Sequence, residues 1–148
     1  MTIAFVDFPA QQQAKQQIAE NVVKWTQMLI EALKHNYVEY SIRGHQHSLF
    51  RDLNNVTYHE DQIDKLKNGD CPIDYQIETG KKYHKVIFVD GGGSRSVHCF
   101  IDKNTGEVYK SATWKAPAKG VRYDLRIIAE RENILQNCDW SGGYLYAR

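Results

Sequence analysis

The stretch from Lys110 to Tyr123 holds the most distinctive set of chemical groups in the sequence. Lysines and an arginine stand around one tryptophan and one tyrosine, with small alanines between them. Cationic groups neutralise phosphates and flat rings stack on bases, so this combination is typical of a surface for single-stranded nucleic acid. We predict a binding patch made of Lys110, Trp114, Lys115, Lys119, Arg122 and Tyr123. The small residues would let a ligand come close, and Pro117 stiffens the loop and lowers its ordering cost. The alternative is a structural loop whose Trp114 closes the open end of a sheet.

Two histidines form the second candidate site. His84 and His98 fall in segments that we expect to be neighbouring strands, because the glycine-rich turn at 90–94 joins them. Two imidazoles can serve as base and acid in RNA cleavage when their pKa values are near the working pH. The spacing places no carboxylate beside either ring. An RNA-cleaving enzyme therefore stays an alternative hypothesis, and we predict no catalytic residue.

The third candidate is a metal site around His45 and His47. These residues are two apart and would share one side of a strand, with His35, His59 or Cys71 as companions. A metal site needs three or four ligands at suitable spacing, and the sequence has no CxxC or HExxH motif. We therefore expect surface histidines, no bound metal and no cofactor.

The glycines at 91–93 suggest a phosphate-binding loop but lack its context. Such a loop follows a strand and leads, through Lys and Ser or Thr, into a helix. Ser94 and Arg95 lead instead into another predicted strand, so we expect a flexible hairpin turn. Cys99 falls within that strand, where a buried inert thiol is the usual case.

Composition and charge place these residues in a globular chain. The 148 residues are 42% hydrophobic and carry a formal net charge of +1, but segment 81–126 holds 10 basic and 4 acidic residues. This local excess supports a polyanion-binding surface, although a packed sheet with outward Lys and Arg side chains would give the same pattern. Three cysteines argue against a secreted disulfide framework, and no apolar run approaches the roughly 20 residues of a membrane span. The first residues lack the order of a signal peptide, so we expect a single domain over 1–148 in the cytoplasm, without membrane contact.

A long amphipathic helix is the clearest predicted element. Residues 10–35 carry an apolar stripe at helical spacing, made of Ile18, Val22, Trp25, Leu29 and Leu33. Such a helix is longer than a small barrel is wide, so its glutamine-rich beginning is expected to project or to pack on a second subunit. We therefore predict a homo-oligomer.

The rest of the chain has the pattern of an antiparallel meander. We expect strands at 37–42, 73–78, 83–89, 97–102 and 107–110, with a turn or strand end at 44–48 and a hairpin turn at 103–106. A capping box from Thr57 to Glu60 predicts a short helix that ends at Asn68 and Gly69. Residues 114–120 should form an extended loop, 121–139 remain ambiguous with a helix to Asn137 as one solution, and 139–146 should form a turn and a short strand. The predicted class is α+β, with a curled sheet or small barrel, because local β pairing dominates.

Residues 96–123 and the ending 139–146 resemble a family of uncharacterised proteins of tailed bacteriophages, of the marine or cyanophage type. The resemblance implies a viral origin, a location in the host cell cytoplasm and an Sm-like or SH3-like small barrel, with a strongly bent antiparallel sheet of about five strands behind the N-terminal helix. It implies no established activity and transfers no functional residue.

Together these features predict a non-enzymatic phage accessory protein. It would form an oligomer and bind single-stranded RNA or DNA, or a nucleotide, through its basic and aromatic patch. A virion assembly or protein-interaction component is the alternative from another class.

Overall fold

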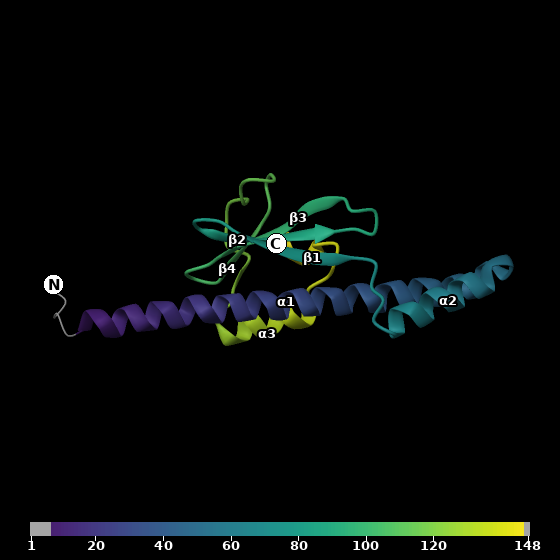
Figure 1. The fold of residues 1–148 in the computed structure, drawn as a ribbon, viewed down its shortest axis with the longest axis horizontal. Helices are drawn as coiled ribbons and strands as arrows, with labels where there is room; N and C mark the ends of the chain where they lie inside the picture. The colour runs from purple at the N-terminus through teal and green to yellow at the C-terminus, as the bar shows by residue number, and fades with distance from the viewer. Residues whose placement is uncertain (1–6, 147–148) are drawn as a thin grey trace.

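The computed structural model describes residues 7–146, in which one long helix lies across one face of an antiparallel sheet (Figure 1). The helices are α1 (Asp7–Arg51), α2 (Val56–Lys67) and α3 (Ile128–Asn137). The strands are β1 (Asp74–Thr79), β2 (Tyr83–Val89), β3 (Arg95–Asp102), β4 (Glu107–Lys110) and β5 (Tyr123–Asp124). Two short 3-10 helices, η1 (Leu53–Asn55) and η2 (Gly143–Leu145), complete the elements. The predicted α+β class, the long N-terminal helix and the five-stranded antiparallel sheet are confirmed.

Helix α1 is longer than predicted and extends beyond the sheet at both ends (Figure 1). The strand expected at 37–42 and the turn expected at 44–48 are wrong, because α1 continues to Arg51. The partly buried positions of this part recur at helical spacing, namely Tyr37, Val38, Ser41, Ile42, His45, Ser48 and Leu49. The residues whose alternation suggested a strand therefore belong to a helix, and the side chains that pack against them come from other parts of the chain.

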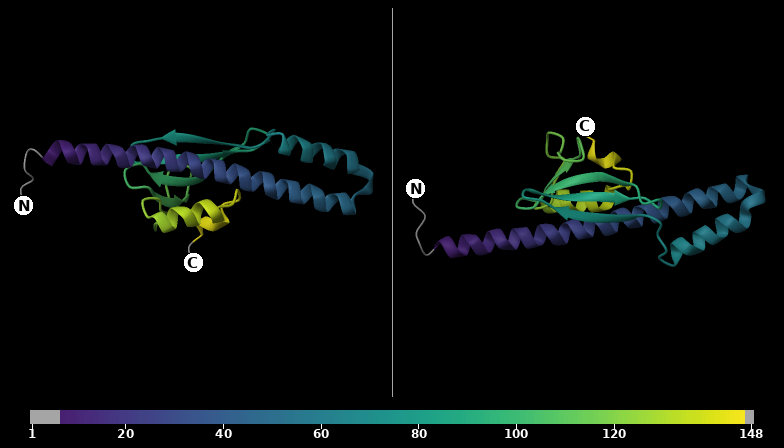
Figure 2. Two further views of the ribbon diagram at one scale, coloured as in Figure 1. Left: turned by 90° about the horizontal axis from the view of Figure 1, so that it is seen from below. Right: turned by 45° about the horizontal axis from the view of Figure 1, so that its top comes forward.

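Helix α2 returns antiparallel along the distal part of α1 and forms a helical hairpin with it (Figure 2). Its buried residues are Ile63 and Leu66. The predicted capping box is wrong, because Asn55 occupies the N-cap and Thr57 lies inside the helix. The predicted end is confirmed: Gly69 has φ +87° just after the C-cap Asn68, a left-handed conformation that favours glycine.

The sheet is an open meander in the order β1-β2-β3-β4-β5. Each predicted strand from 73 onward to 110 is present within a residue or two, and β5 is added after the 111–122 loop. Strands β1 and β5 are the two edges of the sheet, so the expected strongly bent small barrel is wrong. Helices α1 and α3 lie together on one face and cover it, so the sheet does not have to curl on itself to bury that face (Figures 1 and 2). We call this covered side the helix face and the opposite side the open face.

The core lies between α1 and the helix face. Val22, Leu29 and Leu33 of α1 have no exposed surface, and they belong to one cluster with Val86 and Ile101 of the sheet. Ile18 and Trp25 pack partly buried against the same cluster. The predicted apolar stripe of α1 is therefore confirmed. None of the helices described is both long enough and apolar enough to cross a membrane.

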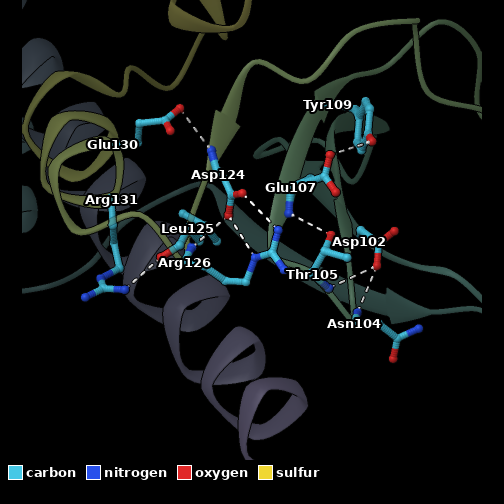
Figure 3. Close-up of polar contacts among 10 residues, drawn as sticks. All are labelled: Asp102, Asn104, Thr105, Glu107, Tyr109, Asp124, Leu125, Arg126, Glu130 and Arg131. Carbon is cyan, nitrogen blue, oxygen red and sulfur yellow. Dashed lines mark hydrogen bonds and ion pairs between the residues drawn. The ribbon is translucent and has the colours of Figure 1, made fainter. Parts of the chain in front are cut away.

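Polar contacts fix the chain between the sheet and α3 (Figure 3). Asp102 accepts hydrogen bonds from the backbone N–H groups of Asn104 (2.9 Å) and Thr105 (3.2 Å), which shapes the β3–β4 turn. The Arg131 guanidinium donates to the Leu125 carbonyl at 2.7 Å and also lies 4.4 Å from the centroid of the Trp25 ring. The segment 121–139, which the sequence left ambiguous, forms β5 followed by α3. The short strand expected near the end is wrong, because residues 143–145 form η2 after Gly142.

Candidate functional site

Strand β4 and the loop after it divide the six predicted nucleic-acid-binding residues between two sides of the sheet. Lys110 is paired with Cys99, and Tyr123 of β5 with Val108, so both belong to the helix face. Trp114 lies instead on the open face, against the side chains of Lys85 and Arg95. The structure brings Trp114 and Lys115 to one side and places Lys110, Arg122 and Tyr123 beside the C-terminal segment.

Residues beside the C-terminal segment use their polar groups to hold it. Arg122 donates from Nε to the Leu145 carbonyl at 2.6 Å, and from Nη1 to the carbonyls of Lys119 and Gly120 at 3.0 and 2.8 Å. The Tyr123 hydroxyl donates to the Tyr144 carbonyl at 3.0 Å. Through these hydrogen bonds Arg122 and Tyr123 hold the C-terminal segment against the sheet. The side chain of Lys119 belongs to an exposed residue of the connecting loop.

The loop 111–120 rises from the sheet on the side away from α1 (Figure 1). A bridge between Ser111 and Pro117 and a 2.7 Å hydrogen bond from the Ala118 N–H to the Lys110 carbonyl close its base. At its tip Trp114 is 39% exposed. The Lys85 ammonium lies 4.8 Å and the Arg95 guanidinium 5.5 Å from the centroid of the Trp114 ring. The loop therefore presents a partly exposed indole ring that has two cations close to it.

A groove of about 240 Å³ lies next to this ring, between the β1–β2 turn and the loop. We call it the basic groove; its charged lining is Lys81, Lys82, Lys85, Lys115 and Glu78, and its rings are Tyr83 and Phe100. Among the described residues of the lining, Glu78 alone is acidic, and it forms ion pairs with Lys85 (3.8 Å) and with Arg95 (3.5 Å). The groove thus combines an excess of positive charge with aromatic surface.

The sequence prediction missed Lys81, Lys82, Lys85 and Arg95 as companions of Trp114. Their signal was present in the basic excess of segment 81–126. The basic excess did not indicate on which face of the sheet each side chain lies. Lys85 and Phe100 are cross-strand partners, which places the lysine stem beside the buried ring, 5.9 Å from ammonium to centroid.

His84 and His98 lie on paired strands but do not face each other. His84 is opposite Ile101, whereas His98 falls at the register shift between Val86 and Ile87. The His84 Nδ1 is 2.8 Å from the Thr79 hydroxyl, and the His98 Nε2 is 2.7 Å from the Tyr144 hydroxyl. Burial lowers the pKa of His98 to about 4, and burial also lowers the pKa of His84. The two rings therefore have separate partners, and the adjacent acid–base pair that the sequence suggested is not formed.

His45 and His47 lie on α1, where residues two apart point in different directions. The His45 Nδ1 is 2.9 Å from the Nδ1 of His59 on α2, and the His59 Nε2 is 3.7 Å from an Asp52 oxygen. Burial, and then the neighbouring His59, lower the pKa of His45. Over residues 7–146 no group of three or more His, Cys, Asp or Glu side chains is arranged to hold a metal ion.

The turn at 90–94 is a hairpin connection, as predicted. The Asp90 carboxylate accepts hydrogen bonds from the N–H groups of Gly92 and Ser94, both at 2.9 Å. These N–H groups are thus occupied by a side chain of the turn itself. Cys99 is buried, also as predicted, and burial raises the pKa of its thiol.

Comparisons with curated proteins and with solved structures give no match. One family model, described as a family of unknown function (DUF7717), matches residues 5–147 and thus nearly the whole chain. The description gives the family neither an activity nor a source. The chain belongs to this family of unknown function, DUF7717.

Proposed function

We propose that this protein is a non-enzymatic accessory protein, of the tailed-bacteriophage kind that its C-terminal half resembles, and that it binds single-stranded nucleic acid on the open face of its sheet. The observation that carries the proposal is the basic groove beside the exposed ring of Trp114. Phosphates would meet the lysines, and a base would stack on the indole.

Charge on the open face supports an anionic ligand. Lys81, Lys82 and Lys115 belong to exposed residues, and none of them has an ion-pair partner among the described residues. Lys85 and Arg95 share the single carboxylate of Glu78. Released counterions would make binding to such a surface favourable and sensitive to salt.

Exposed aromatic surface favours a single strand over a duplex. A base can stack on Trp114 only when it is free of its own neighbours, as in unpaired RNA or DNA. The two cations close to the ring would then be near the phosphates that flank the stacked base. The proposed contact set is therefore Trp114 and Lys115 from the predicted patch, joined by Lys81, Lys82, Lys85 and Arg95.

Fluorescence polarisation with a labelled single-stranded oligonucleotide tests the proposal. We expect Trp114→Ala to weaken binding about 10-fold through lost stacking. Lys82→Gln and Lys115→Gln should each weaken binding and reduce the slope of log affinity against log salt by about 1. Lys24→Gln, on the exposed side of α1, is the matched control and should bind as the wild type does. Binding that does not weaken as salt rises, or equal binding by Trp114→Ala, would contradict the proposal.

A second candidate function, self-association, is favoured by the free end of α1. All residues from Pro9 to Gln17 are exposed, and this part projects past the sheet (Figure 1). Most of the stability of helices in proteins comes from tertiary packing, and this part of α1 has no buried residue. A second copy of the same segment would supply a packing partner, with Ala10 and Ala14 allowing close approach. Sedimentation equilibrium should then show a dimer that the double substitution Ala10→Glu and Ala14→Glu converts to monomer; a wild type that is monomeric at all concentrations would rule this out.

A further inference from the structure

A second hollow, separate from the basic groove, opens where the C-terminal segment crosses the end of the helix face. Its volume is about 380 Å³, within the range of small-molecule sites. One wall comes from β2 and β3, through Phe88, Ser96 and His98, and the other from residues 140–146. Lys110 and Ser111 close it at the end of β4. We call this hollow the terminal cavity.

Lys110 gives the terminal cavity a positive charge. No acidic residue is among the described residues that line it. The Lys110 ammonium lies 4.8 Å from the centroid of the Tyr146 ring and 3.4 Å from the Ser111 carbonyl, and no ion pair is formed with a described carboxylate. Asp139 lies close by, but its Oδ1 already accepts hydrogen bonds from the Ser141 hydroxyl (2.7 Å) and the Gly143 N–H (3.0 Å). An anion entering the cavity would therefore meet an unpaired cation.

Aromatic rings form the apolar part of the same wall. Phe88 and Trp140 have ring centroids 6.1 Å apart and an interplanar angle of 32°. Trp140 is held in place from behind by Tyr37, whose ring meets it edge-on at 5.4 Å. Tyr146 is 65% exposed, so the mouth of the cavity offers a further ring to a ligand. Flat surfaces of this kind favour a planar ligand.

His98 adds a buried polar group that faces the terminal cavity. Its side chain belongs to a residue that is only 9% exposed, and its Nε2 is bound to the Tyr144 hydroxyl. Tyr75 meets the imidazole edge-on at 5.6 Å and fixes its orientation. Within the described chain the other ring nitrogen, Nδ1, makes no hydrogen bond. This nitrogen is therefore available to a ligand in the cavity, which His98 lines.

From these features we infer that the terminal cavity binds a small anion that carries a planar ring. The anionic group would bind the Lys110 ammonium and the Ser96 hydroxyl, since the Ser111 hydroxyl already donates to the Val97 carbonyl at 3.3 Å. The ring would lie against Phe88 and Trp140, with His98 as hydrogen-bond partner. The site is independent of the proposed nucleic-acid surface, because Lys115 and Trp114 lie on the opposite face.

Amide NMR titrations test this inference with benzoate, indole-3-carboxylate and 5′-AMP as probes. We expect at least one of them to shift the amide signals of Ser96, Ser111 and Gly142 and the Nδ1 signal of His98. Indole, which lacks the charge, and inorganic phosphate, which lacks the ring, should bind about 10-fold more weakly or worse. If none of the three probes shifts these signals, or if indole binds as tightly as indole-3-carboxylate, the inference is wrong.

Substitution of the cation gives a second test of the terminal cavity. Lys110→Met should lower the affinity for the best probe about 10-fold, and Lys110→Arg should retain it within a few-fold. Lys119→Met, in the same region but outside the cavity lining, is the matched control. The amide spectrum of each variant reports whether it is folded. Unchanged affinity in a folded Lys110→Met variant would overturn the inference without affecting the proposal for the open face.

Discussion

The two faces of the sheet bury similar residues in different ways. Ile101 and Phe100 are neighbours on β3 and are 0% and 2% exposed. Ile101 lies under α1 and belongs to the main core cluster. Phe100 lies on the open face, where no helix covers it and where Tyr83, Lys85 and the groove lining surround it. One face is thus closed by helices and the other by side chains and one loop.

This difference separates stability from binding. The helix face removes apolar surface and the imidazole of His98 from water. The open face keeps its charges in contact with solvent, where they are weakly held and free to exchange partners. Substitutions of side chains buried under the helices should therefore change the free energy of unfolding, and those on the open face should mainly change the proposed binding of nucleic acid.

The largest effect is expected for Ile101→Ala. Truncation of this fully buried side chain leaves a cavity under α1, and we expect a loss of about 3.5 kcal/mol in the free energy of unfolding. Ile77→Ala is the matched control: Ile77 lies on edge strand β1, is 36% exposed and should cost about 1 kcal/mol. Urea denaturation followed by circular dichroism measures both. Equal losses for the two variants would show that the helix face is not closed as described.

The next largest effect concerns pH and His98. Burial lowers its pKa from an ordinary value of 6.5 to about 4. Between these values the unfolded chain binds a proton that the folded chain does not, so stability falls as the pH falls from about 6.5 to about 4 and levels off below. The expected contribution is about 3 kcal/mol. His98→Gln should flatten the dependence of unfolding free energy on pH in this range, whereas His47→Gln, on the exposed surface of α1, should leave it unchanged. The pKa values of His84 and His45 are also lowered, so these residues add to the same pH dependence. The slope of each variant is therefore compared with the slope of the wild type. An unchanged slope in His98→Gln would contradict the burial of the ring.

On the open face Trp114→Ala should cost far less. The ring is 39% exposed and loses mainly its contacts with Lys85 and Arg95, so we expect a loss of about 1.5 kcal/mol in unfolding free energy. Trp114→Tyr, which keeps a ring, should lose less than half as much. A loss above about 3 kcal/mol would instead make Trp114 a core residue, as in the structural-loop alternative.

Local signals explain why much of the sheet was predictable. The β2, β3 and β4 segments are joined by short turns, and Gly106 in the second turn has φ +80°, a conformation that glycine adopts at little cost. The stripe from Val22 to Leu33 follows one side of a helix. In each case residues near one another in the sequence carry the whole signal.

Predictions failed where the deciding contact is distant in the sequence. Residues 37–42 form a helix because α2 and Trp140 pack against that part of α1. The sheet stays open because two helices from opposite ends of the chain cover one face. The hydrogen bonds of Arg122 and Tyr123 to the carbonyls of Leu145 and Tyr144, more than 20 residues later, were likewise not predicted. The composition of a short sequence segment does not indicate which distant residues that segment contacts.

The smallest expected effect tests whether charge helps to seat α1 on the sheet. Lys34 of α1 and Asp74 of β1 form an ion pair at 2.8 Å; hydrogen bonding to its partner raises the pKa of Lys34 and lowers that of Asp74. The side chains are 33% and 61% exposed, so water screens most of this interaction. A double-mutant cycle with Lys34→Met and Asp74→Asn should give a coupling of about 0.5 kcal/mol that shrinks as salt rises. Because the pKa of Asp74 is lowered in the folded chain, this coupling should also disappear as the pH falls through that lowered pKa. A coupling above about 1.5 kcal/mol would mean that the helix face depends on charge as well as on burial, and the contrast between the two faces would lose its physical basis.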